Sequence, residues 1–157
     1  MFVCHGNICR SPMAELIFKN MLREQKLEDQ FIVNSSATSD EEINGNIGNP
    51  VYPPAKQELQ KHGISASGKY ATQLQNSDYD RYDFFIGMDR ANVRNMHRIF
   101  GGDPQSKIHR LMEYTNHPDD VADPWYTNRF DITYRDIFEG CTALLTSLRK
   151  QHNVIQQ

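Results

Sequence analysis

The chain has 157 residues, a length typical of one domain built around a single core. Its 17 lysines and arginines against 20 aspartates and glutamates give a net charge of −3, which argues against nucleic acid or a membrane surface as a partner. No apolar run approaches the roughly 20 residues of a membrane span, and the N-terminus does not resemble a secretion signal. Three cysteines favour a reducing compartment. We therefore expect a cytoplasmic protein with one domain over residues 1–157.

Apolar spacing and turn residues divide the chain into alternating strands and helices. A very short strand precedes Cys4, and further strands are expected at residues 31–33, 84–86 and 108–112. Helices are expected from Ser11 to about Gln25 and at about residues 54–62, 90–100 and 130–150. Asp89 is expected to cap the third helix. Residues 34–39 and 40–53 read as loops, and residues 65–81 show no clear pattern.

This alternation predicts an α/β fold with three layers: a four-stranded parallel sheet flanked by helices, with a flavodoxin-like strand order. In such folds, ligands bind beyond the carboxyl ends of the strands, at the point where the strand order reverses. Cys4 ends the first predicted strand, so the sequence places it at this edge of the sheet.

The segment around Cys4 has the composition of an oxyanion-binding loop. A loop that leads from a strand into a helix N-terminus aims backbone N–H groups at one point, and the helix dipole adds positive charge there. Gly6 lets the backbone curl, Ser11 can cap the helix, and Pro12 suits its first position. Arg10 can clamp two oxygens of a tetrahedral oxyanion. In this field Cys4 is expected to react as a thiolate facing a bound phosphate.

The segment V-C-H-G-N-I-C-R-S-P resembles the loop of the low-molecular-weight protein tyrosine phosphatases, V-C-x-G-N-x-C-R-S-P. Asp123-Pro124-Trp125-Tyr126 is similar to the D-P-[YW]-Y segment that supplies the general acid of that family, so the resemblance spans nearly the whole chain. It implies an enzyme that hydrolyses phosphotyrosine monoesters through a phosphocysteine on Cys4. Arg10 would then clamp the phosphate, and Asp123 would act as general acid and base.

The resemblance also assigns the rest of the phosphate-binding loop, which comprises His5, Gly6, Asn7, Ile8, Cys9 and Ser11. Asn7 either tolerates a positive φ in a turn or, as in the family, supports the loop by bonds toward Ser11 and Ser35. Ser11 is expected both to cap the helix and to hydrogen-bond the thiolate. Cys9 is either a packing residue or, as the family implies, a partner that can form a disulfide with Cys4.

The expected substrate cleft is bordered by Glu41, Trp125 and Tyr126. The two aromatic residues would wall the cleft and stack on a substrate ring, although one of them could instead anchor the loop to the core. Animal relatives brace the loop with a histidine where Gly68 stands here. Glu15 is therefore expected to lack its usual partner.

No cofactor and no metal are expected, because the spacing of the six histidines fits none of the zinc patterns. The resemblance implies a phosphotyrosine-containing protein as partner, with a tyrosine kinase among the candidates. The chain is expected to be a monomer or a weak dimer.

Three other functions compete with the tyrosine phosphatase. An arsenate reductase of this fold needs a cysteine relay, but no cysteine lies between Cys9 and Cys141. A phosphate-binding module would need the loss of Cys4, Arg10 or Asp123, and all three are present. Relatives that act on phosphoarginine carry threonine at the position of Ile8, whose apolar wall suits a phenyl ring better. An acidic rim formed with Glu41 would instead favour a guanidinium.

Overall fold

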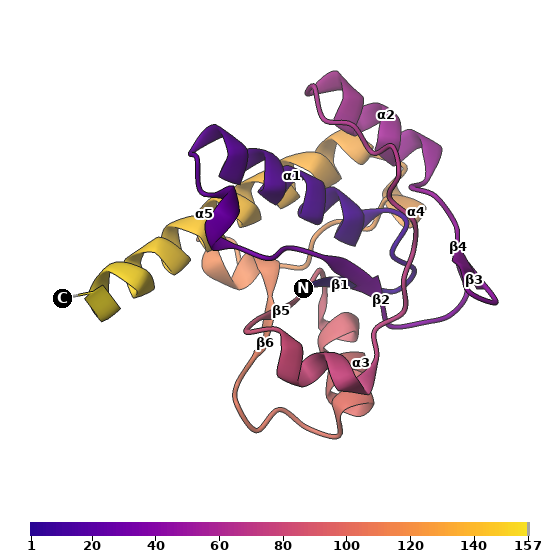
Figure 1. The fold of residues 1–157 in the computed structure, drawn as a ribbon. Helices are drawn as coiled ribbons and strands as arrows, with labels where there is room; N and C mark the ends of the chain where they lie inside the picture. Colours follow the sequence, from indigo (N-terminus) through magenta and orange to yellow (C-terminus); the bar gives the residue numbers. More distant parts are fainter. Residues whose placement is uncertain (157) are drawn as a thin grey trace.

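A parallel sheet of four strands forms the centre of the protein, as predicted. The structure, a computed structural model, describes residues 1–156, and the strand order is β2-β1-β5-β6 with helices on both faces (Figure 1). The strands are β1 Phe2–Cys4, β2 Ser35–Ala37, β5 Phe85–Gly87 and β6 Ile108–Arg110. A separate antiparallel hairpin joins β3 Ile43–Asn44 to β4 Ile47–Gly48. The flavodoxin-like order is confirmed, and β1 lies at its reversal point.

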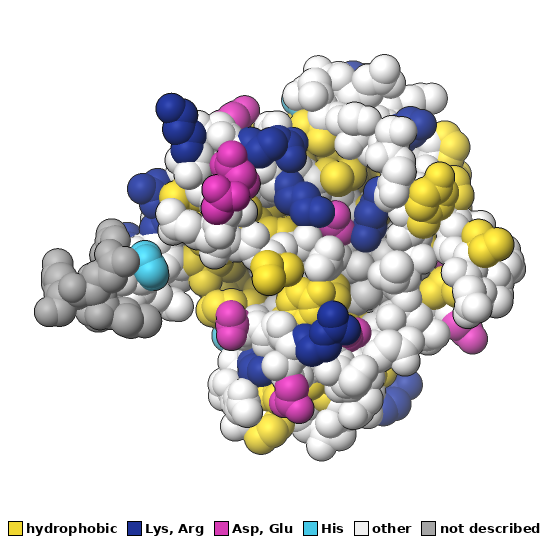
Figure 2. Space-filling view, viewed as in Figure 1, with side chains coloured by type: hydrophobic (Ala, Val, Ile, Leu, Met, Phe, Trp, Pro, Cys, Tyr) yellow, Lys and Arg dark blue, Asp and Glu magenta, His cyan; other side chains and the backbone are white. Residues whose placement is uncertain are grey.

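The helices divide between the two faces of the sheet. They are α1 Arg10–Glu24, α2 Pro53–Lys61, α3 Arg90–Phe100, α4 Pro124–Thr127 and α5 Phe130–Gln156, with 3-10 turns η1 Glu28–Gln30, η2 Asn76–Arg81 and η3 Leu111–Tyr114. Helices α1, α2 and α5 pack together, while α3 contacts β5 and β6 (Figure 1). Hydrophobic side chains emerge between these layers on the face shown in Figure 2, and basic and acidic side chains are interspersed over α1.

The second strand is not where the apolar run predicted it. Residues 31–33 are not a strand, and Ile32 is 82% exposed. The strand is instead Ser35–Ala37, which pairs in parallel with β1 so that Ser35 lies opposite Phe2. Ser35 is buried there because its hydroxyl takes part in a hydrogen-bond network under the loop that follows β1. Burial of a hydrogen-bonded polar side chain thus takes the place of the apolar side chains that the sequence predicted for this strand.

Two helix starts differ from their predictions by one residue. Helix α1 begins at Arg10, and Cys9 precedes it without a side-chain cap. The prediction that Ser11 caps this helix is therefore wrong, although Pro12 still lies in the first turn, whose N–H groups have no partner within the helix. Helix α2 begins at Pro53 rather than at residue 54. The predicted cap of α3 is confirmed, since Asp89 accepts a hydrogen bond from the Asn92 N–H (2.8 Å).

Residues 40–53 were predicted as loop, yet they contain the β3–β4 hairpin, which turns at Gly45 and Asn46. This hairpin is held closely against the segment at Ala71. A Cβ atom on Gly48 would overlap the Ala71 carbonyl, so only glycine allows this approach. The Ala71 N–H also donates to the Asn49 carbonyl (2.8 Å). The hairpin is thereby fixed beside the end of β1.

No helix within residues 1–156 is both long and apolar enough to cross a membrane.

Helix α5 packs so closely on η3 that it requires glycine at position 140. A Cβ on Gly140 would lie 2.5 Å from Cγ of the fully buried Leu111. We expect Gly140→Ala to lower the free energy of unfolding by about 1–3 kcal/mol, because overpacking outweighs the roughly 1 kcal/mol gain in helix propensity. Denaturant unfolding measures this change. In a Leu111→Ala background the same substitution should cost less, and equal costs in both backgrounds would contradict the contact.

Candidate active site

The loop that joins β1 to α1 borders a cavity of about 540 Å³ at the carboxyl end of the sheet. Cys4 through Arg10 form its floor, and residues 41–42, the start of α3 and residues 123–126 form its sides. The structure thus brings Cys4, Arg10 and Asp123 together with the predicted rim residues Glu41, Trp125 and Tyr126. The cavity lies where the sequence placed it, beyond the strand ends at the reversal point of the sheet.

The side chain of Asn7 organises the loop from below. Its Nδ2 donates to Ser11 Oγ (2.8 Å) and Ser35 Oγ (2.9 Å), and its Oδ1 accepts from the Thr72 N–H (3.0 Å). Asn7 also has φ 57°, in the left-handed region that asparagine tolerates. The two roles considered for Asn7 therefore coexist. The bonds to Ser11 and Ser35 that the sequence predicted are both present.

Glu15 ends this network, and its partners are Ser35 and two lysines rather than a histidine at position 68. Ser35 donates to Glu15 Oε1 (2.7 Å), and the ammonium groups of Lys69 (2.9 Å) and Lys19 (2.8 Å) pair with the same carboxylate. Burial alone would raise the pKa of Glu15, but the hydrogen bonds from Lys19, Lys69 and Ser35 outweigh it and lower the pKa. Lys69 follows Gly68 directly and supplies the positive charge that a histidine at position 68 would have brought.

Ser11 faces the sulfur of Cys4. Its hydroxyl oxygen lies 2.9 Å from Cys4 Sγ, and its backbone N–H donates to the same sulfur (3.4 Å). Because Asn7 already donates to Ser11 Oγ, the Ser11 hydroxyl is free to donate to the sulfur. These donors and the N-terminus of α1 all favour negative charge at Cys4.

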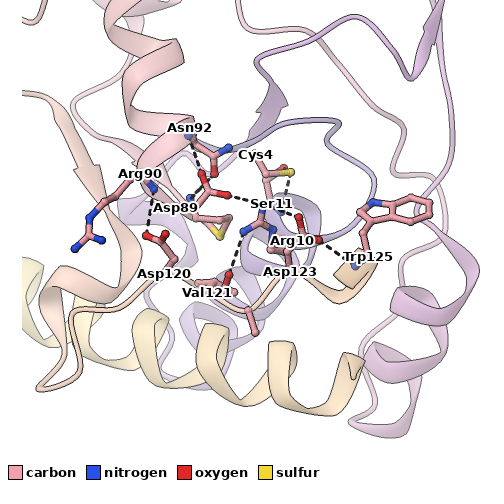
Figure 3. Close-up of polar contacts among 12 residues, drawn as sticks. Cys4, Arg10, Ser11, Asp89, Arg90, Asn92, Asp120, Val121, Asp123 and Trp125 are labelled. Atoms are coloured by element: carbon pink, nitrogen blue, oxygen red, sulfur yellow. Dashed lines mark hydrogen bonds and ion pairs between the residues drawn. The ribbon is translucent and has the colours of Figure 1, made fainter. Parts of the chain in front are cut away.

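The Arg10 guanidinium is held among oxygen atoms beside Cys4 (Figure 3). It donates to Asp89 Oδ2 (2.8 Å) and the Val121 carbonyl (3.1 Å), and it lies 3.6 Å from Asp123 Oδ2. Burial alone would lower the pKa of Arg10, but the charges of Cys4, Asp89 and Asp123 outweigh it and raise the pKa. Arg10 is therefore a permanently charged and well-oriented group.

Asp123 stands on the opposite wall as the cap of the short helix α4. Its Oδ1 accepts from the Trp125 N–H (3.1 Å), and its Oδ2 lies toward Arg10 (Figure 3). Pro124 occupies the first helical position, where its missing N–H costs nothing. The D-P-W-Y segment thus fixes one carboxylate oxygen and leaves the other directed into the cavity.

The rim combines charged and aromatic side chains. His5 Nε2 and Glu41 Oε2 are 3.0 Å apart at one edge. Trp125 packs against Tyr52, with ring centroids 5.0 Å apart, but remains 62% exposed beside the cavity. Tyr126 is 90% exposed. The alternative role of anchoring the loop thus applies in part to Trp125. Tyr126 is an exposed side chain at the mouth of the cavity.

Cys9 is buried beneath the loop as an unpaired thiol, as are Cys4 and Cys141. Burial and the nearby Cys4 raise the pKa of the Cys9 thiol far above its usual value, so it is protonated at neutral pH. A disulfide between Cys4 and Cys9 stays a prediction. Within residues 1–156, no group of three or more histidine, cysteine, aspartate or glutamate side chains is arranged to hold a metal ion.

Sequence reasoning missed three residues of this arrangement: Asp89, Lys69 and Val121. Asp89 was expected only as a helix cap, yet its second oxygen binds Arg10. Its position directly after the buried strand β5 could have indicated this, because the carboxyl ends of neighbouring parallel strands meet at one edge. No sequence signal marks Val121, which contributes a backbone carbonyl.

Comparison with known proteins decides the family. The model of the low molecular weight phosphotyrosine protein phosphatases matches residues 1–154. The chain belongs to this family. Its members are enzymes, and a relative from Bacillus subtilis, the low molecular weight protein-tyrosine-phosphatase YfkJ, is 38% identical over 96% of both chains.

Solved structures of the phosphatase family have the same fold. The crystal structure of Bacillus subtilis YfkJ matches with a TM-score of 0.87 at 38% identity, covering 96% of this chain and 93% of that one. SP-PTP from Streptococcus pyogenes matches with a TM-score of 0.81 at 37% identity, covering 94% and 90%. DARP, a drosophila arginine phosphatase, matches with a TM-score of 0.81 at 26% identity, covering 94% and 95%.

Asp89 offers a test of how the Arg10 clamp is held. We expect Asp89→Ala to lower kcat/KM for an aryl phosphate by about 10- to 100-fold, because a hydrogen bond to a charged group contributes about 1.5–3 kcal/mol. Asp89→Asn keeps an oxygen for the α3 cap but turns an amide N–H toward Arg10, so it should keep the thermal midpoint and lose kcat/KM as Asp89→Ala does. If Asp89→Ala lowers the thermal midpoint but leaves kcat/KM unchanged, Asp89 serves only as a cap.

Proposed function

We propose that this phosphatase hydrolyses phosphotyrosine in proteins, with Cys4 as nucleophile, Arg10 as phosphate clamp and Asp123 as general acid and base. One observation carries the proposal: Cys4 Sγ, the Arg10 guanidinium and a carboxylate oxygen of Asp123 border the same cavity. Residues 4–10 form its floor, and the backbone N–H groups of a loop that leads into a helix N-terminus would hold a phosphate there.

In the first step, the Cys4 thiolate attacks phosphorus in line with the leaving group. Arg10 and the loop N–H groups hold the three equatorial oxygens and stabilise their charge. The S–P bond forms as the bond from phosphorus to the tyrosine oxygen breaks. Asp123, entering this step as a carboxylic acid, gives its proton to the departing phenolate oxygen.

In the second step, water hydrolyses the phosphocysteine. Asp123, now a carboxylate, takes a proton from the water as the water oxygen attacks phosphorus. The S–P bond breaks, and the electron pair returns to sulfur as thiolate, which Ser11 stabilises through its hydroxyl and N–H groups. Inorganic phosphate leaves, and the enzyme returns to its starting state.

Phosphoarginine is the second candidate substrate, because the drosophila arginine phosphatase shares the fold and the rim carries Glu41. Ile8 argues for phosphotyrosine. It lines the cavity with an apolar side chain and offers no hydroxyl to orient a guanidinium or a water. Trp125, which also lines the cavity, supplies a second apolar face for a phenyl ring.

The positions of the cysteines do not support the arsenate reductase alternative. It needs further thiols near the nucleophile, but Cys141 is buried in α5, where its sulfur lies 3.8 Å from the carbonyl of Ala14. Burial raises the pKa of Cys141 and keeps it protonated.

A leaving-group series tests the role of Asp123. We expect Asp123→Asn to lower kcat/KM, which reports formation of the phosphocysteine, by on the order of 10²–10⁴ for phosphotyrosine, whose leaving group needs a proton. The loss should shrink for aryl phosphates with acidic phenols, which depart as anions. Steady-state kinetics with matched aryl phosphates measures the trend. Cys4→Ser, which replaces the thiolate with a weak nucleophile, should be inactive on every substrate.

Equal losses across the series would mean that Asp123 only shapes the loop. Turnover by Cys4→Ser would overturn the proposed nucleophile.

Ile8→Thr tests the choice of substrate. Wild type should hydrolyse a phosphotyrosine peptide faster than a phosphoarginine peptide with the same flanking residues. The substitution should shift the ratio toward phosphoarginine by about fivefold, the equivalent of one added hydrogen bond of about 1 kcal/mol. A wild type that prefers phosphoarginine would contradict the proposed substrate and point to the acidic rim as its determinant.

A further inference from the structure

Two walls of the cavity adjoin segments of opposite charge. Glu41 and Glu42 line one wall, and Ala91, Asn92 and Asn95 of α3 line another. In Figure 1, α3 lies at the bottom of the view and the β3–β4 hairpin, next to Glu41 and Glu42, at its right. The charged side chains beside these two walls play no part in the chemistry proposed above.

Helix α3 presents a row of positive charge that begins beside the cavity. Its sequence, RANVRNMHRIF, contains Arg90, Arg94 and Arg98 at four-residue spacing and no acidic residue. Arg94 and Arg98 share a helix face with Ala91 and with Asn95, which line the cavity, because residues three and four apart are neighbours. Arg98 also donates to Asn95 Oδ1 (2.7 Å), which holds its guanidinium next to the cavity wall.

The charge of this row is not neutralised within the protein. In the part of the chain that the structure describes, neither Arg90 nor Arg94 forms an ion pair, and the Arg90 side chain points away from Arg10 (Figure 3). The nearest carboxylates already have partners. Asp89 binds Arg10 and caps α3, while Asp120 accepts from the backbone N–H of Arg90 (3.1 Å) and pairs with Arg110.

The opposite wall is acidic and firmly held. Asp40, Glu41 and Glu42 are consecutive, and among the described residues only His5, which is 3.0 Å from Glu41, forms an ion pair with them. Glu42 accepts from Asn49 Nδ2 (2.7 Å), and its carbonyl accepts from the Asn49 N–H (2.9 Å). These bonds tie the acidic segment to the β3–β4 hairpin.

We propose that these two walls form a polarised docking surface for the protein segment that carries the phosphotyrosine. Acidic side chains on one side of the phosphotyrosine lie along Arg94 and Arg98, and basic side chains on its other side lie over residues 40–42. The surface thereby favours substrates in which acidic and basic residues flank the phosphotyrosine in one order along the chain over substrates with the reverse order. This inference rests on the proposed phosphotyrosine phosphatase function and adds a substrate class to it.

Charge complementarity around a site acts on encounter rate and specificity more than on the chemical step. Each exposed pair contributes little, about 0.2–1 kcal/mol, but several pairs at once separate two substrates by about 3- to 10-fold in kcat/KM. The effect should fade in high salt, because the Debye length falls to about 3 Å at 1 M. The modest size of the effect and its loss in high salt both distinguish docking around the cavity from a contact inside it.

Two phosphotyrosine peptides of identical composition test the proposal. One carries two glutamates before the phosphotyrosine and two lysines after it, and the other has the reverse order, so their net charges are equal. We expect wild type to hydrolyse one order about 3- to 10-fold faster than the other in kcat/KM, with the ratio approaching one in 1 M salt. In Arg94→Glu/Arg98→Glu the preference should vanish or reverse.

The matched control is Arg23→Glu/Arg149→Glu, which makes the same change in net charge at the far ends of α1 and α5 and should keep the wild-type ratio. If the charge-reversed protein does not fold, Arg94→Gln/Arg98→Gln replaces it and should weaken the preference. Equal rates for the two orders, or a preference that survives in the α3 variants, would overturn the docking surface. Failure to hydrolyse either peptide or an aryl phosphate would instead overturn the proposed function.

Discussion

The geometry of the β1–α1 loop depends on one buried side chain, Asn7. Its amide joins Ser11, Ser35 and the Thr72 backbone, so three segments distant in sequence are fixed to the turn of the loop. Each of its polar atoms has a partner, which makes a buried network stabilising rather than costly. Because Asn7 donates to Ser11, the Ser11 hydroxyl is left to serve the Cys4 sulfur. The surroundings of the Cys4 sulfur, the proposed nucleophile, therefore depend on a residue that forms no hydrogen bond with it.

Two helix caps connect the scaffold to Arg10, the proposed phosphate clamp. Asp89 caps α3 and binds Arg10 with its other oxygen, while Asp123 caps α4 and lies 3.6 Å from the same guanidinium. A buried cation without partners would be strongly destabilising, so these carboxylates are required even before substrate arrives. The same pairing orients the fork of Arg10. A bound phosphate therefore meets a guanidinium that is already charged and in place.

The sequence predicted the parts of this fold that obey local rules. The apolar spacing of α1 and α5, the Asp89 cap and the parallel sheet needed only periodicity and turn chemistry. Strand β2 could not be found in this way, because Ser35 is buried by a network whose other members lie at positions 7, 11 and 15. Apolar runs misplaced the strand at Ile32, which is exposed. For the same reason the pairing of Glu15 with Lys69 followed from no pattern, since it depends on tertiary contact between helix α1 and a loop distant in sequence.

The central claim is that a phosphoryl group passes through the sulfur of Cys4. Rapid acid quenching of the enzyme during turnover of an aryl phosphate with an acidic phenol, followed by peptide mass spectrometry, tests it directly. The account predicts one phosphoryl group on the peptide that contains Cys4, in an amount that rises in Asp123→Asn because the water then lacks its base. Turnover without any phosphorylated Cys4, or with the phosphoryl group on another residue, would contradict the account.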